Sequence, residues 1–249
     1  MREFHMRESR NRVDCSPARV CGFTLLEMLV VMGIMGLLLW MTVPAIHSFS
    51  SAKALTRSAA DIQAILAQAR TQAMLRDSYV FVGFYESDGS LSESVRPAPA
   101  GTGRIWVGVA AIKDGSQGYN LTNAALWNAS NLTPVGKLRF FDNLHLATNA
   151  LFYTSSVTAN TVSPVGDPSS TNTPFGWPLE NSNTVTQFTQ GVIKFTPLGT
   201  AMLPGSLTAP EYIQIALIPT HGNLVLNNTP NAALIQVDAI TGSVRTFLP

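Results

Sequence analysis

The longest run of hydrophobic positions lies near the amino terminus of the chain. Residues 23–46 read FTLLEMLVVMGIMGLLLWMTVPAI and contain one charged residue, Glu27. A helix needs about 20 apolar residues to cross a hydrocarbon layer ~30 Å thick, so this segment predicts a membrane-spanning helix. An ordinary secretory signal has a shorter apolar run, of about 7–15 residues, before a small-residue cleavage site. The small residues at 48–52 leave such cleavage open as an alternative.

A second hydrophobic pattern follows at helical spacing. Apolar side chains recur every three or four residues, with charged and amide side chains between them, as expected for an amphipathic helix. We therefore expect one helix from Phe23 to about Arg76, whose segment 47–76 packs on a sheet. The predicted buried stripe consists of Leu55, Ala59, Ile62, Leu66, Ala69 and Ala73.

From Tyr79 onwards, β-branched and aromatic residues dominate, which predicts strands. The last two strands flank Thr241-Gly242, a pair typical of a tight hairpin turn. A long helix followed by strands predicts an α+β fold with antiparallel sheet in the head, residues 77–249. The predicted strands are 79–85, 104–112, 137–141, 192–195, 212–218, 233–238 and 243–247.

Residues 143–190 interrupt this pattern. Their charged residues are Asp167 and Glu180, and Thr, Asn, Ser and Pro are frequent. Insertions of this length are usually functional or mobile in compact domains. We expect a loop-rich segment that serves either as a variable surface loop or as a contact surface.

Composition narrows the function classes. Only 12% of the 249 residues are charged, which excludes a charged disordered tail. The formal net charge of +1 is too small to imply nonspecific binding to nucleic acid or a polybasic membrane surface. Cys15 and Cys21 are the only cysteines. Their position before the apolar run excludes a disulfide-stapled fold and a zinc ribbon.

The segment before the apolar run is basic. Residues 1–22 contain five arginines against Glu3, Glu8 and Asp14, so this side is expected to stay in the cytoplasm. Glu27 then stands out, because a carboxylate within an apolar span costs on the order of 2–3 kcal/mol and by default indicates function. Solvation of Glu27 at headgroup depth is the alternative.

Gly22-Phe23-Thr24-Leu25-Leu26-Glu27 resembles the processing site of type IV pilins and of the pseudopilins of type II secretion. The resemblance implies that a prepilin peptidase cuts between Gly22 and Phe23 and methylates the amine of Phe23. Cleavage would remove both cysteines and leave 227 of the 249 residues.

The resemblance also implies a role for Glu27 in assembly. A free α-amine has a pKa near 7.7–8.0 and is mostly cationic at neutral pH. When apolar helices stack in a filament, Glu27 of one subunit would pair with the Phe23 amine of its neighbour. Gly33, Gly36 and Pro44 match places where pilin-like helices can melt during assembly, although ordinary packing or bending explains them equally well.

Within the pilin superfamily, the chain resembles the GspH/FimT group of minor pseudopilins and minor pilins. The similarity rests on Asp61–Phe84, on Val192–Gly199 and on the final hairpin. It implies a noncatalytic subunit anchored in the inner membrane, with a cytoplasmic leader and a periplasmic head. The implied partners are the peptidase and other pilins or pseudopilins, in either a type II secretion pseudopilus or a type IV pilus. In such a filament, residues 143–190 could form a contact surface at the tip.

The sequence shows no catalytic or cofactor-binding constellation. His5, His47, His145 and His221 lack metal-ligand spacing and are expected at the surface or as capping residues. Asp238 alone is too little for calcium. No enzyme activity, metal, cofactor or small-molecule substrate is predicted.

Two other functions remain as alternatives. A FimT-like minor pilin could capture DNA, for which Arg245 and a cluster of Lys137 and Arg139 are the candidate contacts. A periplasmic enzyme with an uncleaved anchor is the other. The amino-terminal residue of the mature chain discriminates the anchored enzyme from the filament subunit.

Overall fold

The computed structural model describes the chain from Thr24 onwards, with gaps. The chain divides into two compact units, Met1–His47 and Ser48–Pro249, and each is described by itself. For residues 41–52 and most of the three short strands between 162 and 188, only the backbone is described. The described residues are 24–92, 94, 98–113, 131–147, 162–165, 175–177, 186–188, 191–203, 210–225 and 231–248.

The first unit contains the start of helix α1 (Leu25–Leu75). Thr24 caps the helix, because its Oγ1 and its carbonyl oxygen accept the N–H of Glu27 at 3.3 and 3.1 Å. The backbone stays helical through Gly33, Gly36 and Pro44. The helix expected from Phe23 to about Arg76 corresponds to α1, which runs from Leu25 to Leu75.

Across the described residues, no helix is long and apolar enough to cross a membrane. The predicted spanning segment 23–46 includes Phe23 and the side chains of 41–46, which lie outside the described residues. Its role as a membrane span stays a prediction.

In the second unit, α1 buries the predicted stripe. All six predicted side chains are buried, and Ile65 joins them. The helix ends where Asp77 adopts a positive φ of 48° and the N–H of Ser78 donates to the carbonyl of Ala73 at 3.2 Å. This is the Schellman pattern, which satisfies carbonyls at a helix end.

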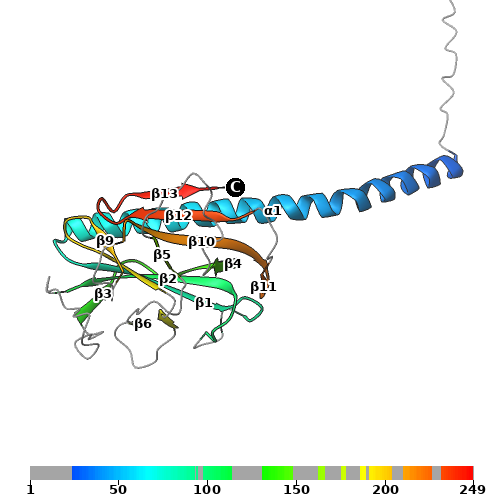
Figure 1. Cartoon of the computed structure of the whole chain (residues 1–249). Helices are drawn as coiled ribbons and strands as arrows, with labels where there is room; N and C mark the ends of the chain where they lie inside the picture. Colours follow the sequence, from blue (N-terminus) through cyan, green and yellow to red (C-terminus); the bar gives the residue numbers. More distant parts are fainter. Residues whose placement is uncertain are drawn as a thin grey trace, which may run out of the picture. The chain divides into compact units, whose positions relative to one another are not determined.

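The head contains a large, mainly antiparallel sheet (Figure 1). In the described part of the chain, its main path runs β13-β12-β10-β4-β2-β1-β8-β9, and β3, β5 and β11 pair beside this path. Only the β5–β10 pair is parallel among these. The predicted α+β class with antiparallel sheet is confirmed. The strands are β1 (Val80–Asp88), β2 (Gly103–Ile112), β3 (Leu132–Pro134), β4 (Arg139–Ala147), β5 (Val162–Pro164), β6 (Phe175–Trp177), β7 (Thr186–Phe188), β8 (Gly191–Phe195), β9 (Ala201–Met202), β10 (Tyr212–His221), β11 (Leu224–Val225), β12 (Ala233–Asp238) and β13 (Val244–Phe247).

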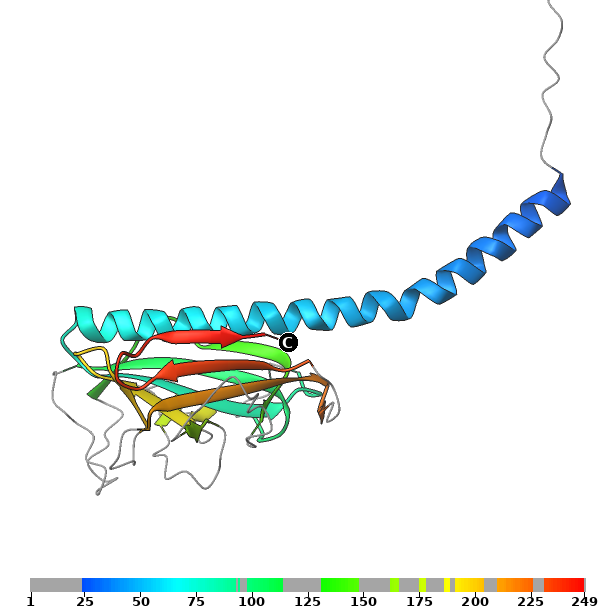
Figure 2. The same ribbon diagram turned by 45° about the horizontal axis from the view of Figure 1, so that its top comes forward.

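The helix covers one face of this sheet and contacts β13 directly (Figure 2). The Nε2 of Gln63 donates to the carbonyl of Val244 at 3.3 Å, and the hydroxyl of Thr246 donates to Gln63 Oε1 at 2.8 Å. Alternate residues of the strands, such as Val82 and Phe84 of β1, join the helix stripe in one core cluster. This core holds α1 on the sheet.

The opposite face of β1, β2 and β8 is also buried. The β6–β7 pair supplies Phe188 and Trp177, whose rings meet edge to face at 6.3 Å between centroids. Gly108 of β2 permits this contact, because a Cβ there would lie 2.4 Å from the Cζ of Phe188. Burial on both faces explains why Val80–Tyr85 is apolar almost without interruption.

The sheet curls until its two ends meet. The N–H of Ala201, at the start of β9, donates to the carbonyl of Ala239, just after β12, at 2.8 Å. A Cβ on Gly242 would lie 2.0 Å from the carbonyl oxygen of Gly199. The β8–β9 turn and the β12–β13 turn therefore touch through their backbones. Glycine fits at position 242 because it has no Cβ to collide there and tolerates the positive φ of 64°.

The predicted final hairpin is confirmed, but its turn is longer than two residues. The N–H of Asp238 donates to the carbonyl of Ser243, so residues 239–242 form the loop. The Oδ1 of Asp238 accepts the N–H groups of Ile240 and Thr241 at 2.9 and 2.8 Å. This carboxylate caps a turn, a role that the sequence analysis did not assign to it.

Strands enter the segment 143–190, where the sequence predicted loops. The strand predicted over 137–141 starts at Arg139 and continues to Ala147, and β5, β6 and β7 lie within the segment. Each of these three strands has only three residues, too few to show a period, and β5 pairs with the distant β10. Asp167 and Glu180 lie outside the described residues.

Lys194 of β8 tests what it costs to bury a charged side chain on the face of the sheet opposite α1. Its Nζ lies 5.2 Å from the ring centroid of Tyr79, and burial lowers the pKa of Lys194. The folded protein therefore binds this proton less tightly than the unfolded chain, so the unfavourable charge is present at neutral pH and is relieved as the pH rises toward about 10.4.

We expect Lys194→Met to raise the free energy of unfolding at pH 7 by less than about 1 kcal/mol, since the lost cation–π contact offsets part of the gain. The difference from wild type should shrink as the pH rises toward about 10.4, the ordinary pKa of lysine. Denaturant unfolding of both proteins measures this. Because burial also raises the pKa of Tyr85, only the difference between the two proteins is interpreted. A pH-independent difference would contradict the expectation.

Candidate functional site

The predicted processing residues, Gly22 and Phe23, lie outside the described residues. The first described residue is Thr24, and Glu27 sits in the first turn of α1 with an exposed side chain. A carboxylate in the first helical turn is favoured by the helix dipole, and Thr24-x-x-Glu27 has the spacing of a capping box. Glu27 is therefore compatible with a helix start as well as with the predicted assembly role.

The first four turns of α1 expose apolar side chains on all sides. The large hydrophobic side chains from Leu25 to Trp40 are between 42% and 84% exposed. A helix that is apolar all round is normally buried in a membrane or among other helices. This segment therefore carries a surface suited to an apolar environment.

Gly33 and Gly36 belong to the same surface. Apart from the adjacent residues and the nearby backbone of the helix itself, a Cβ on either glycine would meet no heavy atom within 4 Å. Close packing within the described chain therefore does not require glycine at these positions. The predicted flexibility at Gly33, Gly36 and Pro44 stays a prediction.

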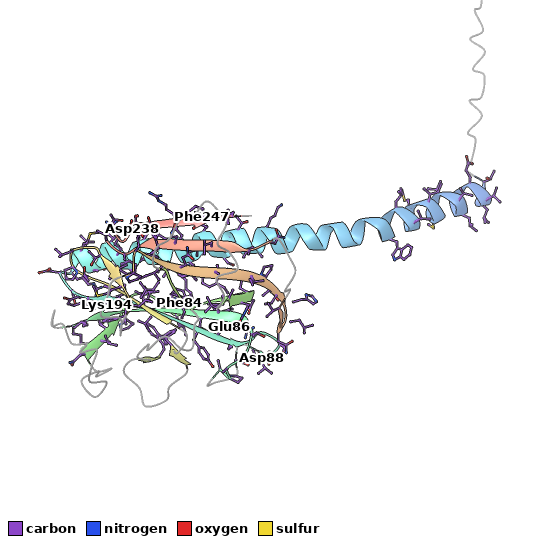
Figure 3. The ribbon with its side chains drawn as sticks, in the orientation of Figure 1. Phe84, Glu86, Asp88, Lys194, Asp238 and Phe247 are labelled. Atoms are coloured by element: carbon purple, nitrogen blue, oxygen red, sulfur yellow. The ribbon has the colours of Figure 1, made fainter. Side chains whose placement is uncertain are left out.

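The head contains a buried polar cluster that the sequence analysis missed. The Glu86 side chain of β1 is 2% exposed and lies 2.9 and 3.0 Å, through its two oxygens, from Nδ1 of His145 on β4. It also accepts the N–H of Gly103 at 3.0 Å and the N–H of Leu146 at 3.3 Å. One carboxylate, labelled in Figure 3, thus links β1 to β2 and β4 through hydrogen bonds.

The cluster lies at an irregularity of the sheet. The register between β2 and β4 shifts between Gly103 and Arg104, and Asn143 has a positive φ of 59°. His145, expected at the surface or as a capping residue, has a side chain 22% exposed and pairs with a buried acid instead. Glu86 and His145 are 59 residues apart, so no local spacing could signal the pair.

A second polar group lies beside this cluster. Arg104 forms an ion pair with Asp142, donates from Nη1 to the carbonyl of Leu91 at 3.1 Å, and lies 5.7 Å from the ring centroid of Phe140. Near the end of β1, hydrogen bonds from the Ser90 hydroxyl and N–H lower the pKa of Asp88. These groups satisfy one another and stabilise the sheet end.

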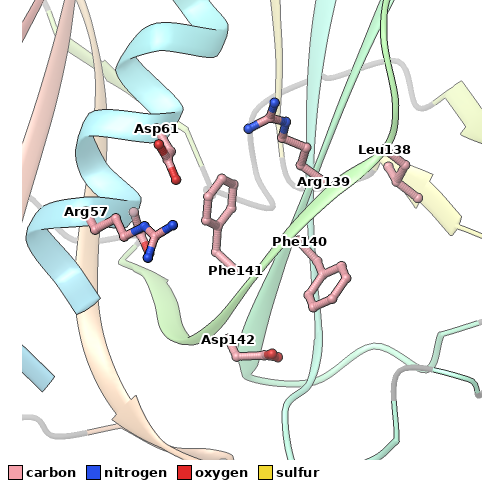
Figure 4. A pocket seen from close by; sticks show the side chains of 8 residues that line it. Arg57, Asp61, Leu138, Arg139, Phe140, Phe141 and Asp142 are labelled. Atoms are coloured by element: carbon pink, nitrogen blue, oxygen red, sulfur yellow. The ribbon is translucent and has the colours of Figure 1, made fainter. Parts of the chain in front are cut away.

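An open groove lies between α1 and β4 (Figure 4). Its volume is about 440 Å³. The groove brings together Arg57 and Asp61 of the helix with Arg139 of β4, and Asp142 also lines it. Because both charge signs are present, the groove is not a uniformly cationic surface. Its other lining residues are Ser58, Leu138, Phe140 and Phe141.

The candidate DNA contacts fall in two places. Arg139 lines the groove and Lys137 is exposed just before β4. Arg245 of β13 lines a separate small hollow with Tyr212, Gln236, Asp238 and Ser243. The structure therefore does not bring these three cations together.

The described side chains show no group of three or more His, Cys, Asp or Glu residues that could hold a metal ion. His221 is exposed at the end of β10. His5 and the side chain of His47 lie outside the described residues. The absence of catalytic activity stays a prediction.

Comparison with known families matches residues 17–43 to the prokaryotic N-terminal methylation motif. The match includes Gly22, Phe23 and Glu27, and it stops one residue before Pro44. The chain therefore carries a type IV pilin-like prepilin signal, which is typical of membrane-anchored filament subunits processed by a prepilin peptidase. No curated protein and no solved structure matches the chain significantly.

Proposed function

We propose that this chain is a noncatalytic structural subunit, a minor pilin or pseudopilin of the GspH/FimT type. It assembles through the first turns of α1 into a type IV pilus or a type II secretion pseudopilus. The observation that carries the proposal is the coincidence of two features. The methylation motif covers residues 17–43, and the helix within it exposes apolar side chains all round.

The apolar surface explains how the subunit could pass from a membrane into a filament. Before assembly, the segment from Leu25 to Trp40 requires a membrane, because exposing so much apolar surface to water is unfavourable. In a filament, neighbouring helices replace the lipid and bury the same surface. Transfer from membrane to filament then exchanges one apolar environment for another.

Glu27 adjusts the electrostatics of that exchange. Cleavage after Gly22 creates a cationic amine on Phe23, four residues before the carboxylate. Burial of either charge alone among helices would be costly, whereas a paired amine and carboxylate compensate each other. The carboxylate therefore favours a stagger in which it meets the amine of the neighbouring subunit.

The GspH/FimT assignment draws on the head. A buried helix stripe leads through a tight end at Asp77 into the apolar strand β1, and the chain closes with the β12–β13 hairpin. These are the parts on which the sequence resemblance rests. In the proposed arrangement the leader faces the cytoplasm, α1 starts in the inner membrane, and the head lies in the periplasm until assembly.

The test is the chemical identity of the mature amino terminus. We expect the full chain, produced with a prepilin peptidase, to begin at N-methylated Phe23 and to have lost its leader of 22 residues. Intact mass and amino-terminal sequencing measure this. The same chain produced without the peptidase is the control and should retain residues 1–22.

Two outcomes would contradict the proposal. A mature chain that keeps Met1 in the presence of the peptidase would favour an uncleaved anchor, as in the anchored-enzyme alternative. A chain that begins near Lys53 would instead indicate an ordinary secretory signal. Either result would remove the filament function.

A further inference from the structure

The first residues of β4 have a strand partner on one side only. On that side, β2 pairs with β4 over residues 139–142. On the other side, β10 pairs with β4 only from Leu144 onwards, and β5 pairs with the start of β10 instead. Among the described strands, none therefore pairs with this side of residues 139–142, which we call the open edge.

The groove between α1 and β4 lies along the open edge (Figure 4). The parts of α1 and β4 that line it belong to the same unit, Ser48–Pro249. Side chains alternate between the two faces of a strand. Phe141 joins the core beneath α1, whereas the ring of Phe140 lies 5.2 Å from that of Trp106 on the opposite face. Residues 139 and 141 therefore face the helix.

Three charged side chains in this groove have no partner in the part of the chain that the structure describes. Arg57 and Asp61 of α1 and Arg139 of β4 form neither an ion pair nor a side-chain hydrogen bond there. Asp142, by contrast, is paired with Arg104. The uncompensated groups are thus two cations and one anion, so the groove has an excess of positive charge.

The open edge favours an extended peptide over a small molecule. Small-molecule sites bury about 70–90% of the surface of their ligand, which an open groove does not do. An unpaired strand edge instead presents backbone N–H and C=O groups, to which an added strand binds in many peptide complexes.

The side chains beside the open edge indicate the composition of such a peptide. A strand added there directs alternate side chains toward α1, where Arg57 and Arg139 lie, and the others toward the face of Phe140. Guanidinium groups bind carboxylates through paired, charge-assisted hydrogen bonds. The fitting peptide therefore alternates acidic and apolar residues.

We propose that the open edge of β4 binds an acidic segment of another protein as an added strand. A second copy of this chain does not supply such a segment. Acidic residues two positions apart occur only at Glu86 and Asp88, and both lie in β1, which is already paired. This site goes beyond the proposed function and does not depend on filament assembly.

Fluorescence anisotropy with the full chain in detergent micelles tests the proposal. The probe is a fluorescein-labelled hexapeptide in which glutamate alternates with valine and phenylalanine. One control peptide has glutamine for every glutamate, and the other keeps the composition but places the three glutamates in a row. We expect both to bind at least about tenfold more weakly, because one lacks the charge and the other directs its carboxylates to both faces. Equal binding of the three peptides would overturn the proposal.

A double variant tests the two arginines. Arg57→Gln/Arg139→Gln is expected to bind the probe at least about tenfold more weakly than wild type, since the charge-assisted hydrogen bonds are lost. Arg245→Gln is the matched control, an exposed arginine on β13 outside the groove, and should bind like wild type. Circular dichroism should show the same fold in all three proteins. Equal loss in the control, or no loss in the double variant, would contradict the proposed site.

N-methylated probes distinguish strand addition from contact through side chains alone. In an added edge strand, alternate residues direct their N–H groups toward the sheet and the others direct theirs away. Methylation of one alternate set should therefore abolish binding, and methylation of the other set should change it by less than about threefold. Equal effects of the two sets would overturn strand addition. Tighter binding of a single-stranded DNA hexanucleotide than of the probe would overturn the choice of an acidic peptide.

Discussion

Replacement of Glu27 by glutamine is expected to prevent incorporation of the processed chain into filaments while the head keeps its fold. The change removes the charge that would neutralise the Phe23 amine of a neighbour. Breaking one half of a buried ion pair costs about 3–5 kcal/mol, which corresponds to a loss of roughly two to four orders of magnitude in the assembly equilibrium. Quantitative immunoblotting of isolated filaments against total processed protein measures this loss.

Glutamine separates the charge of Glu27 from its place in the helix start. Thr24 accepts the N–H of residue 27 with its hydroxyl, and a capping box accommodates either Glu or Gln at that position. The Glu27→Gln chain should therefore begin α1 normally. Thr24→Ala, which weakens the cap and keeps the carboxylate, is expected to cost only about 1 kcal/mol of helix stability and to leave assembly largely intact.

Two further measurements serve as controls for this prediction. Glu27→Asp keeps the negative charge on a shorter side chain and should restore part of the incorporation lost in Glu27→Gln. The thermal midpoint of the head should be the same in all these variants, because Glu27 belongs to the unit Met1–His47 and the core lies in Ser48–Pro249. Normal filament incorporation of Glu27→Gln would remove the proposed role of this carboxylate.

Local periodicity made the helix and the main strands predictable. The stripe from Leu55 to Ala73 repeats at helical spacing, and every member that was predicted to be buried is buried. The strand predicted over 233–238 has the bounds observed for β12. Such patterns arise because residues that share a face must share a period, and this information lies within a few neighbouring residues.

Contacts between distant segments were not predictable in the same way. The short strands β5, β6 and β7 have no measurable period, and their positions depend on partners elsewhere in the chain. The Glu86–His145 pair spans 59 residues, and the contact between Gly199 and Gly242 joins two turns. A sequence pattern identifies an element, whereas these contacts depend on how the elements fold together.

For the candidate processing site, the sequence is more informative than the structure. Gly22, Phe23 and Glu27 were identified from a short linear motif, because the peptidase implied by the resemblance would act on a segment of chain rather than on a folded surface. The structure adds the exposure of the apolar side chains from Leu25 to Trp40 and the cap at Thr24. It contributes most in the head, where it shows the buried Glu86–His145 pair that no linear motif indicates.

The buried carboxylate of Glu86 leads to the largest expected change in stability. Glu86→Ala would leave the N–H groups of Gly103 and Leu146 and the Nδ1 of His145 without this acceptor. Each buried group left unsatisfied costs about 1–3 kcal/mol, so we expect the free energy of unfolding to fall by about 3–5 kcal/mol. Denaturant unfolding of the processed protein, followed by circular dichroism, measures the loss.

Asp88→Ala is the matched control on the same strand. Asp88 lies two residues further along β1 near solvent and bonds to Ser90 within its own turn, so its removal should cost far less than removal of Glu86. Similar losses in the two variants would show that β1 tolerates neither change and that the three-strand link has no special weight. A loss below about 1 kcal/mol in Glu86→Ala would mean that water or a rearranged side chain replaces the carboxylate. Since Glu86 lies outside the predicted assembly surfaces, whatever fraction of Glu86→Ala remains folded should still enter filaments, in contrast to Glu27→Gln.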